Sequence, residues 1–313
     1  MPDLSHLTEP VRWTLLGILA LLVTASLVAR LMPPRQPEQR AELLARIGSW
    51  WIIVGLLAVA LVIGQTAMIV LFGLISYLAL KEYLSMIPTR RADRTLLLWA
   101  YLAIPLQYVW VAIGWYGMFV IFIPVYMFLA LPAIMVLHGE TGGFLKAAGT
   151  LHWGLMTSVF AISHAAFLLT MPMEVNPAAG GAGLLLFLLI LTGFNDVAQY
   201  VTGKTFGRHK VSPKVSPNKT IEGLAGGILI TAALAIPLGW LLTPFHHWHA
   251  ALIGAALAIG GFFGDVTISA IKRDLGLKDS GSILPGHGGI LDRIDSLTFT
   301  APLFLHIFRY FYT

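Results

Sequence analysis

The sequence predicts an all-α, polytopic membrane protein with about ten transmembrane helices and a polar site that faces the cytoplasm. The chain of 313 residues is 57% hydrophobic and only 11% charged, with a mean hydropathy of +0.80. Soluble domains carry roughly 25% charged residues, so composition excludes an ordinary soluble protein. Apolar runs recur along the whole chain, which excludes a secreted protein with one signal peptide. The basic residues also gather in every second connection between these runs.

Ten apolar runs are long enough, or nearly long enough, for the roughly 20 residues that a membrane helix requires. The second and third are separated by little more than Gly64, Gln65 and Thr66, so they predict either a tight hairpin or one long bent helix. The ten runs cover residues 13–32, 50–63, 68–80, 96–113, 119–137, 153–170, 183–201, 223–242, 250–268 and 297–312.

The positive charges test this map, because Lys and Arg collect in cytoplasmic connections. All but two of the 20 Lys and Arg residues lie at the end of the first run or in connections that follow odd-numbered runs. The exceptions are Arg12 and Arg309. This alternation predicts ten spans with both termini outside. It places the protein in a membrane such as the bacterial inner membrane. Merging the second and third runs would reverse the side of every later connection.

Composition also limits the chemistry. The chain has no cysteine, which excludes disulfides, thiolate metal sites and a cysteine nucleophile. We interpret the net charge of +5 as a determinant of orientation and of affinity for lipid headgroups, and expect no nucleic-acid partner. We divide the chain into N-terminal transmembrane helices, 1–180, and a C-terminal catalytic region, 181–313. Residues 38–47 predict either a short interfacial helix or a solvated connector.

One polar stretch, residues 269–295, stands between two apolar runs and reads SAIKRDLGLKDSGSILPGHGGILDRID. Lys and Arg bind phosphate oxygens, Lys as a point charge and Arg as a bidentate fork. Asp carboxylates suit Mg²⁺, which takes one or two of them and leaves positions for substrate phosphates. Each of these residues alone is more typical of a solvated loop. Together they indicate phosphate chemistry.

A second polar group comes earlier in the chain. Asn195 and Asp196 lie near the end of the seventh apolar run, where a carboxylate is costly unless it faces a bundle interior or a wet cavity. Asp265 lies at the end of the ninth run. Alone, each is also explained by a helix end near the membrane surface.

These residues resemble the signature of the phosphatidate cytidylyltransferase (CDP-diacylglycerol synthase) family. That signature is filled here by Ser269, Lys272, Arg273, Lys278, Asp279, Gly281, Leu284, Pro285, His287, Gly288, Gly289, Asp292, Arg293 and Asp295. An upstream block of the same family is filled by Asp196, Tyr200, Gly203, Lys204, Phe206, Gly207, Ser216, Pro217, Lys219, Thr220, Glu222 and Gly223. The Gly264-Asp265 pair also matches. The resemblance covers about residues 190–295.

The resemblance implies transfer of a cytidylyl group from CTP to phosphatidic acid or a related lipid phosphate, with release of pyrophosphate. It implies Mg²⁺ at the metal ligands Asp265 and Asp292, and leaves a second cation and a homodimer open. The implied catalytic residues are Lys272, Arg273, Lys278, Asp279, His287, Arg293 and Asp295. Of these, His287 would orient a phosphate without moving a proton. The implied substrate-binding residues are Asp196, Lys204, Ser216, Lys219, Thr220, Glu222 and Ser269.

Two positions depart from the family pattern. Gln199 stands where Ala is common, and Ile221 where Trp is usual. Neither change removes a charge, so we expect both to affect the choice of lipid more than the chemistry.

Two other functions stay open on the residues alone. A transporter would also have many helices and intramembrane polar residues, although the polar groups here gather on one side and no inverted repeat is evident. A family member that uses a different lipid phosphate is the second alternative. Turnover of radiolabelled CTP with a panel of lipid phosphates distinguishes a transporter, a phosphatidate cytidylyltransferase and an enzyme for a different lipid phosphate.

Overall fold

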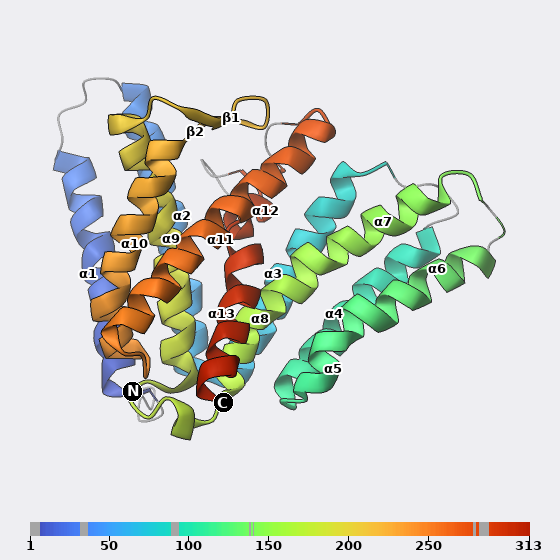
Figure 1. Ribbon diagram of the computed structural model, residues 1–313, viewed down its shortest axis with the longest axis horizontal. Helices are drawn as coiled ribbons and strands as arrows, with labels where there is room; N and C mark the ends of the chain where they lie inside the picture. Colours follow the sequence, from blue (N-terminus) through green and yellow to red (C-terminus); the bar gives the residue numbers. More distant parts are fainter. Residues whose placement is uncertain are drawn as a thin grey trace.

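The computed structural model describes residues 7–31, 37–88, 94–137, 139, 141–277, 280–281 and 288–313, without the side chains of 37–42. It is a bundle of long helices, and α1 begins at the same end of the bundle at which α13 finishes (Figure 1). A two-stranded hairpin lies at the opposite end (Figure 1). A chain that crosses the bundle an even number of times has its first and last helices begin and finish at the same end, as here.

Helices dominate every described part of the chain. In chain order they are α1 (Glu9–Leu31), α2 (Pro37–Ile63), α3 (Gln65–Met86), α4 (Arg94–Ala112), α5 (Tyr116–Ile121), α6 (Phe128–Leu137), α7 (Phe144–Leu155), α8 (Ala161–Phe167), α9 (Gly180–Phe206), α10 (Ile221–Leu242), α11 (His247–Asp274), α12 (Leu291–Ile294) and α13 (Leu297–Tyr312). Turns of π-helix at Phe122–Met127 and Met156–Phe160 join α5 to α6 and α7 to α8, and 3₁₀ turns cover Leu168–Thr170 and Met173–Val175.

Among the described residues, nine helical segments are long and apolar enough to cross a membrane. The tenth predicted span is α13, whose 16 residues give a length of about 24 Å, shorter than the roughly 30 Å hydrocarbon core. It nevertheless packs along α8 and α11 inside the bundle. The chain is thus an all-α polytopic membrane protein, as the sequence predicts.

The second and third apolar runs form separate helices. Gly64 interrupts them with φ of 128°, a conformation that side-chain-bearing residues rarely adopt. The two helices pack against each other, so the hairpin alternative is confirmed. Residues 38–47 are neither a separate interfacial helix nor an irregular connector, because α2 begins at Pro37 and continues without a break. Proline suits a first helical turn, where its missing N–H has no partner to lose.

The C-terminal helices form the part of the bundle that carries the polar residues. Helices α9, α10 and α11 pack on one another, and α13 connects α11 to α8 (Figure 1). Their apolar contacts include Phe187 and Phe304, which are fully buried with ring centroids 5.5 Å apart. Such aromatic pairs stabilise a core beyond the area they bury. By contrast, α1 buries few side chains, as expected of a helix that faces lipid.

The sequence did not predict the antiparallel hairpin of β1 (Lys210–Ser212) and β2 (Ser216–Thr220), which pairs Lys210 with Thr220. It lies between α9 and α10 and leads directly into α10. Thr220 caps that helix, since its hydroxyl accepts a hydrogen bond from the N–H of Gly223 at 3.1 Å. The hairpin therefore sets where α10 begins and holds Lys219 beside the helix ends.

Candidate active site

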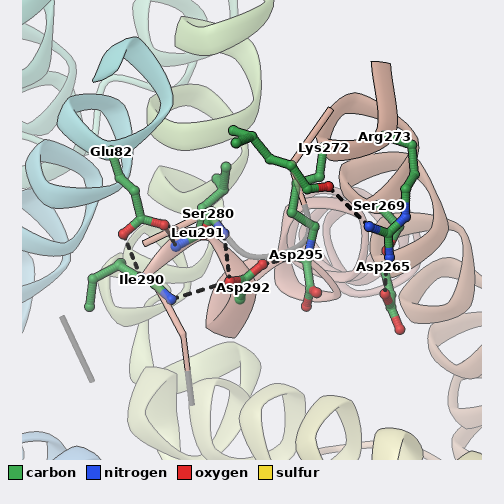
Figure 2. A network of polar contacts seen from close by, with 12 residues as sticks. Glu82, Asp265, Ser269, Lys272, Arg273, Ser280, Ile290, Leu291, Asp292 and Asp295 are labelled. Carbon is green, nitrogen blue, oxygen red and sulfur yellow. Dashed lines mark hydrogen bonds and ion pairs between the residues drawn. The ribbon is translucent and has the colours of Figure 1, made fainter. Parts of the chain in front are cut away.

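A cluster of charged side chains lies where α9, α11, α12 and the hairpin meet. We call it the polar cluster. Most of its residues appear in Figure 2, which shows α11 and the segment around α12 presenting their polar side chains to each other. The cluster comprises Asp196, Lys219, Asp265, Ser269, Lys272, Asp292, Asp295 and Ser296.

Asp292 and Lys272 form the most buried ion pair of this cluster. The Lys272 Nζ atom lies 2.6 Å from Asp292 Oδ1, and the two side chains are only 11% and 8% exposed. The other carboxylate oxygen of Asp292 accepts backbone N–H bonds from Ser280 at 3.0 Å and Gly289 at 3.2 Å (Figure 2). Burial alone raises the pKa of Asp292, but the hydrogen bond and positive charge of Lys272, together with the two backbone N–H groups, outweigh burial and hold the pKa below its ordinary value.

Asp265 forms a second ion pair with a lysine from the hairpin. Its Oδ2 atom lies 2.7 Å from Lys219 Nζ, and its Oδ1 accepts a hydrogen bond from the Ser269 hydroxyl at 3.2 Å. Asp265 and Ser269 are one helical turn apart on α11, so they share a face. Both predicted metal ligands are therefore carboxylates that lie within 3 Å of one ammonium group each, at 2.7 Å for Asp265 and 2.6 Å for Asp292.

Two further carboxylates, Asp196 and Asp295, lie beside these ion pairs. The Ser296 hydroxyl donates to Asp196 at 3.0 Å and so joins α9 to the start of α13. Burial, together with the nearby charges of Asp265 and Asp196, raises the pKa of Asp295 well above its ordinary value. Three carboxylates that repel one another form an environment that a divalent cation would stabilise.

The donor chemistry fits Mg²⁺, although the side chains are not arranged as a closed metal cage. Among the described residues, no three acidic or histidine side chains are close enough to enclose a metal ion. Oxygen ligands from one or two carboxylates are what Mg²⁺ usually takes from a protein, with substrate and water supplying the rest. Asp265 and Asp292 supply that number.

Two of the predicted residues, Glu222 and Arg273, bind the backbone in or next to the hairpin and are not part of the polar cluster. The Glu222 carboxylate accepts the backbone N–H of Arg208 at 2.9 Å and contacts the His209 ring at 2.6 Å. Arg273 donates to the carbonyls of Val215 at 3.4 Å and Leu277 at 3.0 Å.

The remaining predicted residues have fewer contacts with the polar cluster. Lys204 lies over the ring of Tyr200, 5.7 Å from its centroid, on the exposed side of α9. Ser216 is half-buried in β2, and Arg293 on α12 lies within electrostatic range of Asp196. Lys278, Asp279 and His287 fall outside the described residues, so the roles predicted for them stay predictions.

Three contributors were missed by the sequence reasoning: Glu82, Ser280 and Ser296. Glu82 on α3 accepts hydrogen bonds from Ser280, Ile290 and Leu291. Its signal was a carboxylate at the end of an apolar run, the same signal that marked Asp196. Ser296 directly follows the signature and gave no sign of its contact with Asp196.

The departure at Gln199 now has a structural context. Gln199 is buried, its Oε1 accepts from Lys219 Nζ at 3.2 Å, and its Nε2 donates to the Ala258 carbonyl at 3.4 Å. Ile221 is 55% exposed at the first position of α10. The two departures are thus separate: Gln199 contacts the ammonium that pairs with Asp265, whereas Ile221 faces outward. An effect of Ile221 on lipid choice stays a prediction.

We expect Gln199→Ala to lower turnover roughly tenfold, because a hydrogen bond to a charged group contributes about 1.5 kcal/mol or more. Alanine removes the acceptor that holds Lys219, so that the ammonium keeps only the carboxylate of Asp265 and the ring of Phe262 among its described partners. The measurement is the turnover number at saturating substrates, with Ile221→Ala as the matched exposed control. Equal effects of the two variants would contradict the role of Gln199.

Comparisons with known proteins identify the family of this chain. Residues 44–311 match the model of the cytidylyltransferase family. A protein of Escherichia coli (strain K12) named uncharacterized protein YnbB is 46% identical over 298 residues, which cover 95% of this chain and 98% of that protein.

Two staphylococcal relatives carry a name that states an activity. Proteins named phosphatidate cytidylyltransferase, from Staphylococcus epidermidis (strain ATCC 12228 / FDA PCI 1200) and Staphylococcus aureus (strain COL), are each 44% identical over 126 residues. The aligned stretch covers 39% of this chain and 48% of each of those proteins, so the chain spans about half the length of these two relatives. With the family model covering most of the chain, the protein belongs to the cytidylyltransferase family.

Proposed function

We propose that this protein is an integral membrane cytidylyltransferase that converts CTP and phosphatidic acid into CDP-diacylglycerol and pyrophosphate, a step of phospholipid biosynthesis. The observation that carries the proposal is the coexistence of two lysine–aspartate pairs, Lys219–Asp265 and Lys272–Asp292, in one cluster at the ends of apolar helices. Lysines neutralise phosphates and carboxylates hold Mg²⁺. The names of the staphylococcal relatives support the choice of substrate.

The chemistry needs positioning more than proton transfer. An oxygen of the lipid phosphate attacks the α-phosphorus of CTP, the bond from that phosphorus to the bridging oxygen breaks, and pyrophosphate leaves with that oxygen. The lipid phosphate is already an anion, so it needs no strong base. The barrier comes from bringing two polyanions into line, which cationic side chains lower by neutralising charge and fixing geometry.

Lys219 and Lys272 have two roles in this proposal. Before substrate binds, each neutralises one carboxylate at 2.7 Å and 2.6 Å respectively. When phosphates arrive, each ammonium group can turn towards them, because a lysine has three donors on a flexible stem.

Asp265 and Asp292 would hold Mg²⁺. The bound ion would neutralise charge that develops on the phosphate oxygens. Ser269 and the backbone N–H groups of Ser280 and Gly289 keep the two carboxylates in place.

We also propose that the polar cluster faces the cytoplasm. The hairpin end of the bundle carries the basic connection between α9 and α10, with Lys204, Arg208, Lys210, Lys214 and Lys219. Basic connections stay on the cytoplasmic side during insertion. This is also the side where a soluble nucleotide is available, and where the headgroup of a lipid phosphate reaches the interface.

A second lipid phosphate is the alternative substrate. The relative that matches 95% of the chain has no activity in its name, whereas those named phosphatidate cytidylyltransferase match 39% of it. The chemistry at the polar cluster would be the same for any lipid phosphate. The difference would lie in the surfaces that contact the lipid tail.

One experiment tests both the reaction and its side. Membrane vesicles containing the protein, prepared inside-out or right-side-out, receive radiolabelled CTP, Mg²⁺ and one of several lipid phosphates, with protein-free vesicles as the control. We expect labelled lipid and pyrophosphate in equal amounts, from inside-out vesicles only, and fastest with phosphatidic acid. Faster transfer to another lipid phosphate would establish the alternative. Absence of transfer with every lipid would contradict the proposal.

A further inference from the structure

Glu82 is a buried carboxylate that the proposed reaction does not use. It lies on α3, far from the signature in sequence, and is only 6% exposed. A buried carboxylate is strongly destabilising unless charge pairs or hydrogen bonds compensate its loss of water. In the described part of the chain, no lysine or arginine pairs with it. Within that part, its compensation comes from hydrogen bonds.

The three described hydrogen-bond donors to the Glu82 carboxylate lie within the signature stretch, residues 269–295. The Ser280 hydroxyl and the Leu291 N–H donate to Oε1, the latter at 3.2 Å, and the Ile290 N–H donates to Oε2 at 2.8 Å. Figure 2 shows that Glu82 lies on a separate helix from the residues of the polar cluster and points toward these groups. One carboxylate thus joins residues from both sides of segment 282–287.

The carboxylate fits tightly against the backbone of the signature. A Cβ atom on Gly289 would overlap the carboxylate of Glu82, so only glycine allows this approach. Backbone amides bound this closely leave little freedom to the chain around residues 289–291.

The same residues also fix the metal-ligand candidate Asp292. Ser280 donates its hydroxyl to Glu82 and its backbone N–H to Asp292. Gly289, whose N–H donates to the same oxygen of Asp292, directly precedes Ile290. Glu82 therefore binds Ser280 directly and binds Ile290, the residue next to Gly289, so it restrains the two backbone donors to one oxygen of Asp292. The other oxygen of Asp292 accepts from Lys272.

We propose that Glu82 is a positioning residue, which anchors Ser280, Ile290 and Leu291 to α3 and thereby holds Asp292 in the orientation that cytidylyl transfer requires. This inference rests on the proposed function for its catalytic consequence, but its structural part does not. Glu82 itself touches no atom that reacts. It makes the N-terminal helices part of the site, although the signature lies in the C-terminal region.

The test is Glu82→Gln, which keeps the size of the side chain but presents an amide NH₂ where a carboxylate oxygen accepts. The two amides bind different carboxylate oxygens, and the glutamine keeps only one oxygen, so we expect at least one of the backbone amides of 290 and 291 to exchange with deuterium at least about tenfold faster. Turnover at saturating CTP and lipid should fall at least about tenfold. The control is Glu174→Gln, which removes an exposed carboxylate between α8 and α9 and should change neither quantity.

Ser280→Ala is the second variant, because it removes one donor to Glu82 and keeps the backbone N–H that binds Asp292. It should lower turnover several-fold even if Glu82→Gln loosens the whole bundle. Unchanged turnover in Ser280→Ala, or unchanged exchange at 290 and 291 in Glu82→Gln, would overturn the positioning role. If wild-type protein transfers no cytidylyl group but Glu82→Gln still accelerates exchange at these amides, the proposed function fails while the anchoring stands.

Discussion

Asp265→Asn and Asp292→Asn are each expected to lower cytidylyl transfer at least about a hundredfold, a loss of about 2.7 kcal/mol in transition-state stabilisation. Each change removes the negative charge that we assign to a metal ligand and leaves the size of the side chain almost the same. The two should differ in stability. Asp265 is a quarter exposed and paired with Lys219, whereas Asp292 is buried with Lys272, so only Asp292→Asn should also destabilise the fold.

The measurement is turnover as a function of Mg²⁺ concentration, with a chelator as the metal-free reference. Asp274→Asn is the matched control, because it removes an exposed carboxylate from the end of the same helix, α11, and should keep full activity. A variant of Asp265 or Asp292 that retains more than about a tenth of wild-type turnover at saturating Mg²⁺ would show that its carboxylate is not an essential ligand. Full turnover of wild type in the chelator would exclude the metal altogether.

Lys272→Met should abolish turnover and also destabilise the protein by about 3–5 kcal/mol, the usual effect of removing one partner from a buried ion pair. Both side chains of this pair are about nine-tenths buried, so solvent screens the remaining charge of Asp292 poorly. The double variant Lys272→Met with Asp292→Leu should regain part of the stability, since the unpaired charge is gone, although the N–H groups of Ser280 and Gly289 lose their acceptor. It should regain no activity, because both charges are gone.

Stability is measured by thermal unfolding in detergent, and activity by CTP turnover, for the single and double variants side by side. Lys81→Met, which removes an exposed lysine from α3, controls for the loss of one positive charge. If the double variant is no more stable than Lys272→Met, the buried charge of Asp292 is not the cause of the destabilisation. If it turns over CTP, the pair is structural and has no part in the reaction.

Hydropathy predicted the membrane class and the places of the nine described helices that are long enough to span, because length and apolarity determine whether a helix can cross a bilayer. They could not predict that α2 begins at Pro37, since the polar residues 38–42 have no apolar signal. Nor could they place the π-helical turn at Phe122–Met127, which contains Pro124. A proline removes one helical N–H donor, but its effect on the neighbouring turns depends on packing.

The residues brought together at the polar cluster were predicted well when they lay within the signature or its upstream block. Asp265, Lys272 and Asp292 are in one place, as expected. Glu82 was missed because its role depends on α3 lying beside α12, and no local pattern encodes a contact between residues 208 positions apart. The hairpin was missed for a related reason: strands of three and five residues are too short for periodicity to identify.

The hydrogen bond between Ser296 and Asp196 has a consequence for how the protein is made. Ribosomes deliver Asp196, in the second half of α9, 100 residues before they deliver Ser296. Lys219 and Asp265 also follow later in the chain. A carboxylate costs up to roughly 2.5–3.5 kcal/mol when a lone helix enters the membrane. Helix α9 must therefore enter the bilayer because its leucines outweigh the cost of the carboxylate. The polar contacts of Asp196 with Ser296 then form only in the final stage of biosynthesis.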